Sequence, residues 1–107
     1  KERFNFIEVL NWGQTTEANL IINSTSLGLN DSDKIKMDNR YFKADNIFYD
    51  VIYNPYETNF LRDAKKQGCN TQNGLLMFLH QAAEAFKTWH NIEPIINEDV
   101  INLLKND

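Results

Sequence analysis

The stretch that decides the fold runs from Asp50 to Glu84 and reads DVIYNPYETNFLRDAKKQGCNTQNGLLMFLHQAAE. It begins inside the best strand candidate of the chain, the apolar run Ile47–Tyr53, and Pro55 marks the end of that run. A helix is predicted from the N-cap Thr58 through Gln67, and Gly68 suits the left-handed position that follows a helix. A strand followed by a helix is the order expected of an α/β fold.

Further elements are predicted on both sides of this stretch. The run Asn19–Asn23 is compact and apolar, as expected of a strand buried on both faces of a parallel sheet. Strands that alternate with helices predict an α/β fold with a mostly parallel sheet and flanking helices. The other expected elements are a weak strand at 5–9, a polar turn at 12–17, an irregular segment at 31–43 with a helical turn near 39–42, a short strand at 69–71, a helix that Asn73 caps from Gly74 to about Trp89, and a last helix capped by Asn97.

Composition narrows the range of partners. The chain has 107 residues, enough for one small domain, and 42% of them are hydrophobic, which is ordinary for a globular protein. A formal net charge of -4 makes nucleic acid or an anionic membrane surface an unexpected main partner. No apolar run approaches the roughly 20 residues that span a bilayer. The single Cys69 excludes an intrachain disulfide, and one cysteine with two separated histidines makes no recognisable metal site.

Candidate ligand-binding residues follow from the rule that open α/β sheets bind ligands beyond the carboxyl ends of their strands. Asn23 closes one predicted strand and Tyr53 closes another, and both side chains can hydrogen-bond. On the helix that follows, Gly74, Met77 and Gln81 fall within an arc of roughly 60°. This stripe combines a backbone open to close approach, a soft apolar surface, and an amide that both donates and accepts.

Each candidate also has a purely structural interpretation. Gln81 is more often a structural hydrogen-bonder, Tyr53 a core aromatic residue with a satisfied hydroxyl, and Met77 a core residue. The segment Asn23–Thr25 is usually only a turn at the end of a strand. Cys69 is expected to be a small buried hydrophobic residue, because nothing near it in sequence suggests a lowered pKa.

Three ordered motifs resemble the shikimate dehydrogenase family. Asn23-Ser24-Thr25-Ser26-Leu27-Gly28 resembles its Asn-x-Thr-x-x-Gly loop, and Asp50-Val51-Ile52-Tyr53-Asn54-Pro55 resembles its Asp-x-x-Tyr-x-Pro segment. Asn73-Gly74-Leu75-Leu76-Met77 followed by Gln81 resembles its last signature. Each motif is modest alone, but their order and spacing are specific. One departure is Leu76, which stands where the family usually has a second glycine.

The resemblance implies a role for each matched residue. Tyr53 and Gln81 would bind shikimate or 3-dehydroshikimate. The cofactor, NADP with NAD not excluded, would contact the residues Asn23, Ser24, Thr25, Val51, Gly74 and Met77. The implied reaction is the NADPH-dependent reduction of 3-dehydroshikimate to shikimate in a cytoplasmic enzyme of aromatic amino acid (chorismate) biosynthesis.

The resemblance also implies that the chain is a fragment. Residues 1–107 would form the C-terminal half of a Rossmann-like NADP-binding domain, with 74–107 as helices at an interdomain cleft. The substrate domain, the Gly-rich loop and the catalytic Lys and Asp would lie upstream, so we expect no catalytic residue here. The fragment alone is expected to be inactive, and either to self-associate through an exposed sheet edge or to be marginally stable. Two alternatives are a quinate/shikimate-type paralogue and a non-catalytic α/β binding module.

Overall fold

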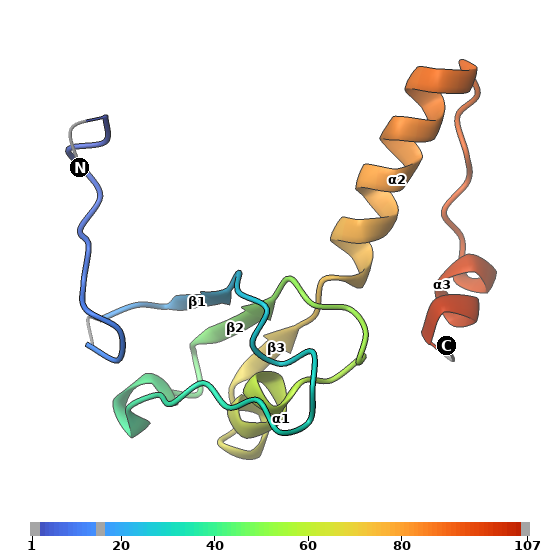
Figure 1. Ribbon diagram of the computed structural model, residues 1–107. Helices are drawn as coiled ribbons and strands as arrows, with labels where there is room; N and C mark the ends of the chain where they lie inside the picture. Colours follow the sequence, from blue (N-terminus) through green and yellow to red (C-terminus); the bar gives the residue numbers. More distant parts are fainter. Residues whose placement is uncertain (1–2, 15–16, 106–107) are drawn as a thin grey trace.

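The computed structural model describes residues 3–14 and 17–105. A three-stranded sheet lies at the centre, with a short helix against it, a long helix leading away on one side and the N-terminal segment on the other (Figure 1). The elements in chain order are β1 (Leu20–Asn23), the 3-10 helix η1 (Asn39–Tyr41), β2 (Ile47–Asp50), α1 (Asn59–Lys66), β3 (Asn70–Gln72), α2 (Leu75–His90) and α3 (Glu98–Lys105).

The sheet is parallel and runs in the order β1-β2-β3. Asn23 pairs with Asp50 across β1 and β2, and Tyr49 pairs with Gln72 across β2 and β3. The carboxyl ends of the strands therefore share one edge of the sheet. The predicted fold class, an α/β fold with a parallel sheet and flanking helices, is confirmed.

The core lies between the sheet and α1. Phe48 is fully buried at its centre, and its ring lies 5.3 Å from the rings of both Phe42 and Phe60. Leu61, Ala64 and Cys69 complete the buried cluster. Because side chains alternate across a strand, this cluster covers only the face of the sheet on which Phe48 lies.

The ends of α1 and the start of α3 follow the predicted capping residues, whereas the start of α2 does not. Thr58 Oγ1 accepts a hydrogen bond from Leu61 N at the start of α1, and Gly68 takes a positive φ of 82° just after its end. Asn97 Oδ1 accepts from Val100 N at 3.0 Å and caps α3 as predicted. The predicted cap of α2 is one residue off, because α2 begins at Leu75 with Gly74 as its N-cap, and Asn73 Oδ1 accepts from Leu75 N at 3.2 Å in the turn before the helix. The short strand expected at 69–71 is β3, one residue further on.

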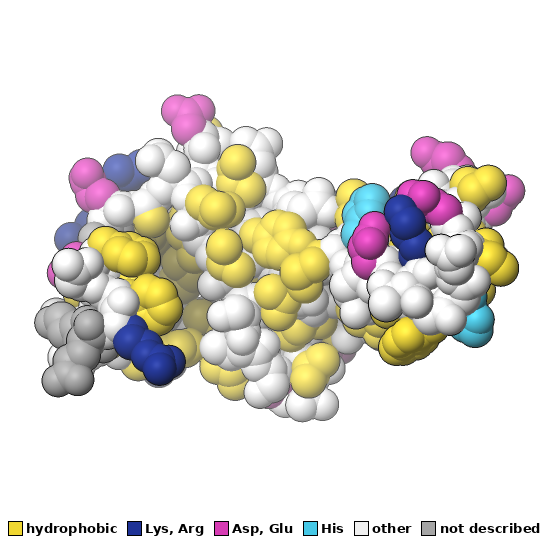
Figure 2. Space-filling model, turned by 90° about the horizontal axis from the view of Figure 1, so that it is seen from above, with side chains coloured by type: hydrophobic (Ala, Val, Ile, Leu, Met, Phe, Trp, Pro, Cys, Tyr) yellow, Lys and Arg dark blue, Asp and Glu magenta, His cyan; other side chains and the backbone are white. Residues whose placement is uncertain are grey.

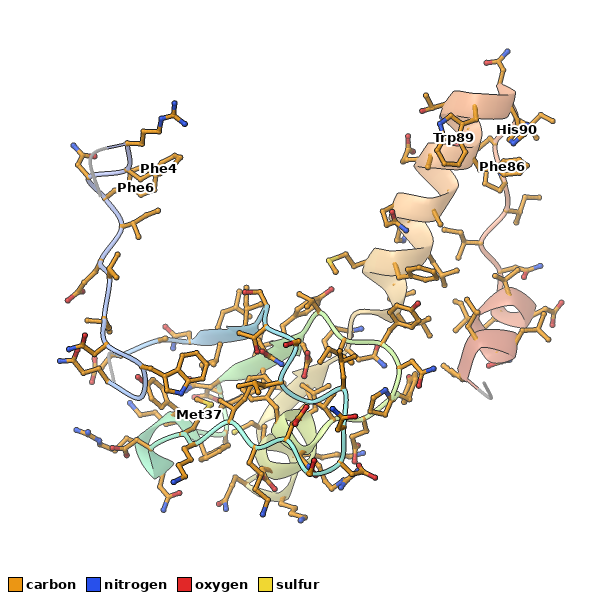
Figure 3. The ribbon with its side chains drawn as sticks, in the orientation of Figure 1. Phe4, Phe6, Met37, Phe86, Trp89 and His90 are labelled. Atoms are coloured by element: carbon orange, nitrogen blue, oxygen red, sulfur yellow. The ribbon has the colours of Figure 1, made fainter. Side chains whose placement is uncertain are left out.

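Helix α2 carries the chain away from the sheet, and α3 turns back toward it (Figure 1). Phe86, Trp89 and His90 lie at the end of α2 far from the sheet (Figure 3). Trp89 is 77% exposed there, and the Phe86 and His90 rings lie 4.4 Å apart. The outer part of α2 is therefore not part of the core of the described chain.

Two predicted strands differ from the structure. β2 ends at Asp50 rather than Tyr53, because the Asp50 carboxylate accepts a hydrogen bond from Ile52 N at 3.0 Å and the chain bends away. Residues 5–9 form no strand. Ile7 N instead donates to Phe4 O at 3.1 Å in a turn, where Phe4 and Phe6 pack edge to face. The polar turn expected at 12–17 is present at 12–13, while Thr15 and Thr16 lie outside the described residues.

The expectation that β1 is buried on both faces is wrong. Leu20 and Ile22 are 52% and 54% exposed, and Ile47 beside them on β2 is 45% exposed. They lie on the face of the sheet opposite α1, which no described element covers. Figure 2 shows hydrophobic side chains gathered over the middle of the molecule on the side seen from above.

Candidate functional site

A buried carboxylate organises the carboxyl edge of the sheet. Asp50 is fully buried, and its Oδ1 accepts hydrogen bonds from Asn23 Nδ2 at 3.1 Å and from Ile52 N at 3.0 Å. Its Oδ2 accepts from Thr58 Oγ1 at 2.6 Å. Asp50 therefore joins the end of β1, the bend after β2 and the start of α1. Such a buried charge is tolerable because its oxygens accept strong hydrogen bonds.

Asn23 uses all of its side-chain hydrogen bonds inside the protein. Its Nδ2 donates to Asp50 and to Leu27 O, and its Oδ1 accepts from Thr25 N at 3.1 Å and from Thr25 Oγ1 at 2.7 Å. Thr25 Oγ1 also accepts from Leu27 N. The Asn23 side chain thus shapes the loop that follows β1 and has no hydrogen-bonding capacity left over. On the same loop, Ser24 is exposed.

A second acid holds the far side of the same loop. Asp33 Oδ2 accepts from Gly28 N at 3.1 Å and from Asn30 N at 3.2 Å. These hydrogen bonds to the charged form, with Gly28 the larger contributor, lower the pKa of Asp33 below its ordinary value of 3.8. The loop from Asn23 to Asn30 is therefore fixed at both of its ends.

Gly74 brings the start of α2 against the end of β2. Gly74 N donates to Ile52 O at 3.1 Å, and a Cβ atom at position 74 would overlap the carbonyl group of Val51. Val51 N in turn donates to Asn23 O at 3.0 Å. Asn23, Val51 and Gly74, all predicted to contact the cofactor, are therefore consecutive neighbours along the carboxyl edge of the sheet.

Tyr53 and Gln81 each contact Phe78, Tyr53 through the Phe78 ring and Gln81 through the Phe78 main-chain carbonyl. The half-buried Tyr53 ring stacks on the ring of Phe78, with centroids 4.3 Å apart and an interplanar angle of 21°. Gln81 is exposed, and its Nε2 donates to Phe78 O at 3.0 Å. Met77, the neighbouring residue, is 46% exposed, whereas Leu75 and Leu79 are buried. Of the predicted stripe, Met77 and Gln81 therefore face outward, whereas Gly74 is buried against Val51.

A groove lies beside β1. It has a volume of about 430 Å³ and is lined by apolar residues such as Trp12, Ile22 and Met37 and by the polar segment Asn23–Thr25. It does not include the predicted residues of β2 and α2. The predicted site residues thus fall into two groups. One group lines this groove and consists of Asn23, Ser24 and Thr25. The other lies where the end of β2 meets α2 and consists of Val51, Tyr53, Gly74, Met77 and Gln81.

Two residues of this region were not predicted as site residues. Asp50 belongs to the quoted motif, and a carboxylate directly after an apolar strand is the signal that marks it. Phe78 carries no such signal, because an apolar residue in an amphipathic helix predicts only burial. Cys69 is buried as predicted, and burial raises the pKa of its thiol.

The described residues show neither a metal site nor a membrane span. Within residues 3–14 and 17–105, no group of three His, Cys, Asp or Glu side chains is placed to hold a metal ion. Across the same residues, no helix is both long enough and apolar enough to cross a bilayer.

Comparison with known proteins gives sequence relatives but no match to a protein-family model. The chain is 49% identical over 104 residues to a protein of Pelagibacter ubique strain HTCC1062 named shikimate dehydrogenase (NADP(+)). The matched region covers 97% of this chain and 39% of that relative. The chain therefore spans well under half the length of that relative.

Solved structures agree with the sequence comparison. The fold resembles a shikimate dehydrogenase in complex with NADP+ (TM-score 0.68, 38% identity), covering 82% of this chain and 30% of that one. It resembles shikimate 5-dehydrogenase from Listeria monocytogenes in complex with shikimate and NAD (TM-score 0.68, 30% identity, 84% and 30% covered). A quinate dehydrogenase from Corynebacterium glutamicum in complex with NAD is also similar (TM-score 0.66, 29% identity, 83% and 30% covered).

Proposed function

Because the chain belongs to the shikimate dehydrogenase family, we propose that it is the C-terminal part of the cofactor-binding domain of an NADP-dependent shikimate dehydrogenase. The parent enzyme would interconvert 3-dehydroshikimate and shikimate. The observation that supports this proposal is the arrangement around Phe78, whose ring stacks on Tyr53 and whose carbonyl accepts a hydrogen bond from Gln81 one turn further along α2. A phenol and an amide are both groups that suit the hydroxyls of a polyol substrate.

The residues where β2 meets α2 fit the nicotinamide end of a dinucleotide. Met77 offers an exposed thioether for the flat face of the ring. For the carboxamide, the Val51 carbonyl is an acceptor to which no donor is found among the described residues. Ser24 and Thr25 would lie along the rest of the cofactor, on a loop that Asn23 holds in shape. NADP is the cofactor we propose, since the Pelagibacter relative is named for it, and the NAD complexes keep NAD as a second choice.

In this reaction the residues of the chain bind and orient, and they do not transfer protons. The chemistry that NADP(H) supplies when bound is the gain or loss of a hydride. In the oxidation direction, Tyr53 and Gln81 would hold the ring hydroxyls of shikimate, so that the reacting carbon faces Met77. The groups that take the hydroxyl proton are proposed to lie in the rest of the parent polypeptide. We therefore expect the 107-residue chain to be inactive by itself.

The test of this proposal is NADP-linked oxidation of shikimate by the native polypeptide that contains this segment, with the 107-residue chain assayed in parallel. We expect activity from the first only. In the native polypeptide, Gln81→Ala should cost about 1–3 kcal/mol of transition-state binding, seen as a higher KM for shikimate and a lower kcat. Gln67→Ala is the matched control, because Gln67 is an exposed glutamine at the end of α1. Unchanged kinetics in Gln81→Ala would contradict the assigned role.

A second candidate substrate is quinate, which the resemblance to the Corynebacterium enzyme favours. Quinate and shikimate share the ring hydroxyls that Tyr53 and Gln81 would bind, so these residues do not separate the two substrates. The ratio of kcat/KM for shikimate over quinate, measured on the native polypeptide, decides between them. A ratio above one supports the main proposal, and a ratio below one supports the paralogue.

We also propose the cytoplasm as the compartment. The support is the single buried Cys69, whose thiol suits a reducing environment. Fractionation of the source cells, with NADP-linked shikimate oxidation followed in each fraction, would test it. Activity concentrated in a membrane or secreted fraction would contradict the proposal.

A further inference from the structure

We propose that Phe78 is a positioning residue for the substrate, one that holds the Tyr53 ring so that the Tyr53 hydroxyl and the Gln81 amide face the same ligand. This inference rests on the proposed function, because it concerns how the two proposed substrate-binding residues are aligned. It goes beyond that function because Phe78 itself carries no group that binds a polyol.

The first support is what fixes the Tyr53 ring. Tyr53 follows the bend after β2, and its hydroxyl has no hydrogen-bond partner among the described residues, so a hydrogen bond does not set the ring angle. The stack on Phe78, with centroids 4.3 Å apart and planes 21° from parallel, is the ring contact that does. Offset stacking is a preferred geometry for aromatic pairs, and it limits a ring to few orientations.

The second support is that Phe78 also contacts Gln81. The Phe78 carbonyl accepts from Gln81 Nε2 at 3.0 Å, which orients the amide of an otherwise exposed side chain. This leaves the Gln81 carbonyl oxygen and one N–H for a ligand. The ring of Phe78 therefore sets the position of Tyr53, while its main chain sets that of Gln81. Only the first of these contacts is lost when the side chain is replaced.

The location of Phe78 agrees with this role. It is half-buried in the first part of α2, between the exposed Met77 and the buried Leu79. Gly74, in the preceding turn, lies against Val51 and anchors the start of the helix to the end of β2. The Phe78 ring that packs on Tyr53 therefore belongs to a helix whose start is fixed to the sheet. A substrate-binding group that must be placed accurately needs such a rigid support.

The experiment uses the full native polypeptide and measures KM for shikimate and for NADP separately. Phe78→Leu, which removes the aromatic face, should raise the KM for shikimate about 3- to 10-fold, the range that an aromatic pair is worth. The KM for NADP should stay within about twofold. Phe78→Tyr keeps the stacking face and should restore the wild-type KM. Phe86→Leu makes the same change at the far end of α2 (Figure 3) and is the matched control.

A double-mutant cycle separates positioning from simple structural support. Tyr53→Phe removes the hydroxyl but keeps the ring, so in that background Phe78→Leu should raise the shikimate KM less than about twofold further. Fully additive effects, or an equal rise in both KM values, would overturn the inference. If Phe78→Leu does not fold, Phe78→Met fills a similar volume without an aromatic face and must show the same shift. Wild-type polypeptide without shikimate turnover would overturn the proposed function and this inference together, whereas turnover with additive effects would overturn this inference alone.

Discussion

Gly74 lies against the main chain of Val51 so closely that a methyl group at position 74 would overlap the Val51 carbonyl and stand 3.1 Å from its Cα atom. This contact joins the start of α2 to the end of β2, and the hydrogen bond from Gly74 N to Ile52 O reinforces it. No side chain takes part in the contact, because Gly74 has none and the Val51 atoms that face it belong to the main chain. It depends only on the absence of a Cβ atom at one of the two residues.

Gly74→Ala is therefore expected to destabilise the protein by steric overlap. Gly74 has an ordinary φ of -79°, so alanine would suffer no conformational strain there, and the cost comes from displacing α2 from β2. We expect a loss of about 1–3 kcal/mol in the free energy of unfolding, or more if the helix cannot shift. Urea denaturation of the native polypeptide measures it.

Gly68→Ala is the complementary control for this prediction. A Cβ atom at Gly68 would meet nothing within 4 Å, but the positive φ of 82° disfavours alanine. Its cost should be about 1 kcal/mol and should leave the kinetics unchanged, since Gly68 is remote from the candidate site. Gly74→Ala with wild-type stability and wild-type kinetics would mean that the Val51 contact is loose in solution.

The network around Asp50 gives a second prediction. Asp50→Asn removes the acceptor of the Thr58 hydroxyl and leaves that donor buried, at a cost of about 1–3 kcal/mol in the free energy of unfolding. Thr58→Val should cost a similar amount, because it also removes the cap of α1, whereas Thr58→Ser should keep both hydrogen bonds. Guanidinium denaturation of the three variants tests this order. Equal stability of Thr58→Val and Thr58→Ser would contradict the role of the hydroxyl.

The elements and their order could be predicted from local patterns. The cap at Thr58, the glycine at 68 and the apolar run before Asp50 each act over a few residues, and the structure confirms α1, β2 and the parallel sheet that they indicated. The early end of β2 was missed, because apolar character continues through Tyr53 while the hydrogen bond from Ile52 N to Asp50 already bends the chain.

Contacts between residues that lie far apart in sequence could not be predicted from such local patterns. A cofactor contact at Gly74 stays a prediction, but the close approach of the Val51 main chain to Gly74 could not be predicted, because it depends on how α2 meets the end of β2. The stacking of Tyr53 on Phe78 depends on how α2 leaves the sheet, which periodicity does not determine. Burial of Leu20 and Ile22 was predicted because they belong to an apolar run, but both are exposed. An apolar run indicates only that a strand can be covered on both faces, and not that another element covers it.

The lowered pKa of Asp33 predicts a dependence of stability on pH. A carboxyl whose folded-state pKa is depressed stabilises the fold above its unfolded value of 3.8, and this contribution is lost as pH falls through the lower folded value. Asp33→Asn should therefore be less stable than wild type near neutral pH, and the difference should vanish below the lowered pKa. Asp31→Asn, an exposed neighbour, is the control. A difference that persists unchanged in strong acid would show that the charge of Asp33 is not responsible.

The exposed face of the sheet leads to a prediction about the 107-residue chain by itself. Leu20, Ile22 and Ile47 are each about half exposed on one face, and β1 is an edge strand of the described sheet. Apolar surface next to an open edge favours pairing between copies. We expect sedimentation velocity to show self-association that increases with concentration.

Replacing Leu20 and Ile22 by lysine should shift the chain toward monomer, because charge on an edge strand opposes pairing between strands. Leu103→Lys, at a 70% exposed position on α3, should leave the association unchanged, since α3 does not border the sheet face. A wild-type chain that stays monomeric at all concentrations would mean that neither the open edge nor the apolar face attracts a second copy. Association that survives the lysine pair but is lost in Leu103→Lys would place the contact on the C-terminal helices instead.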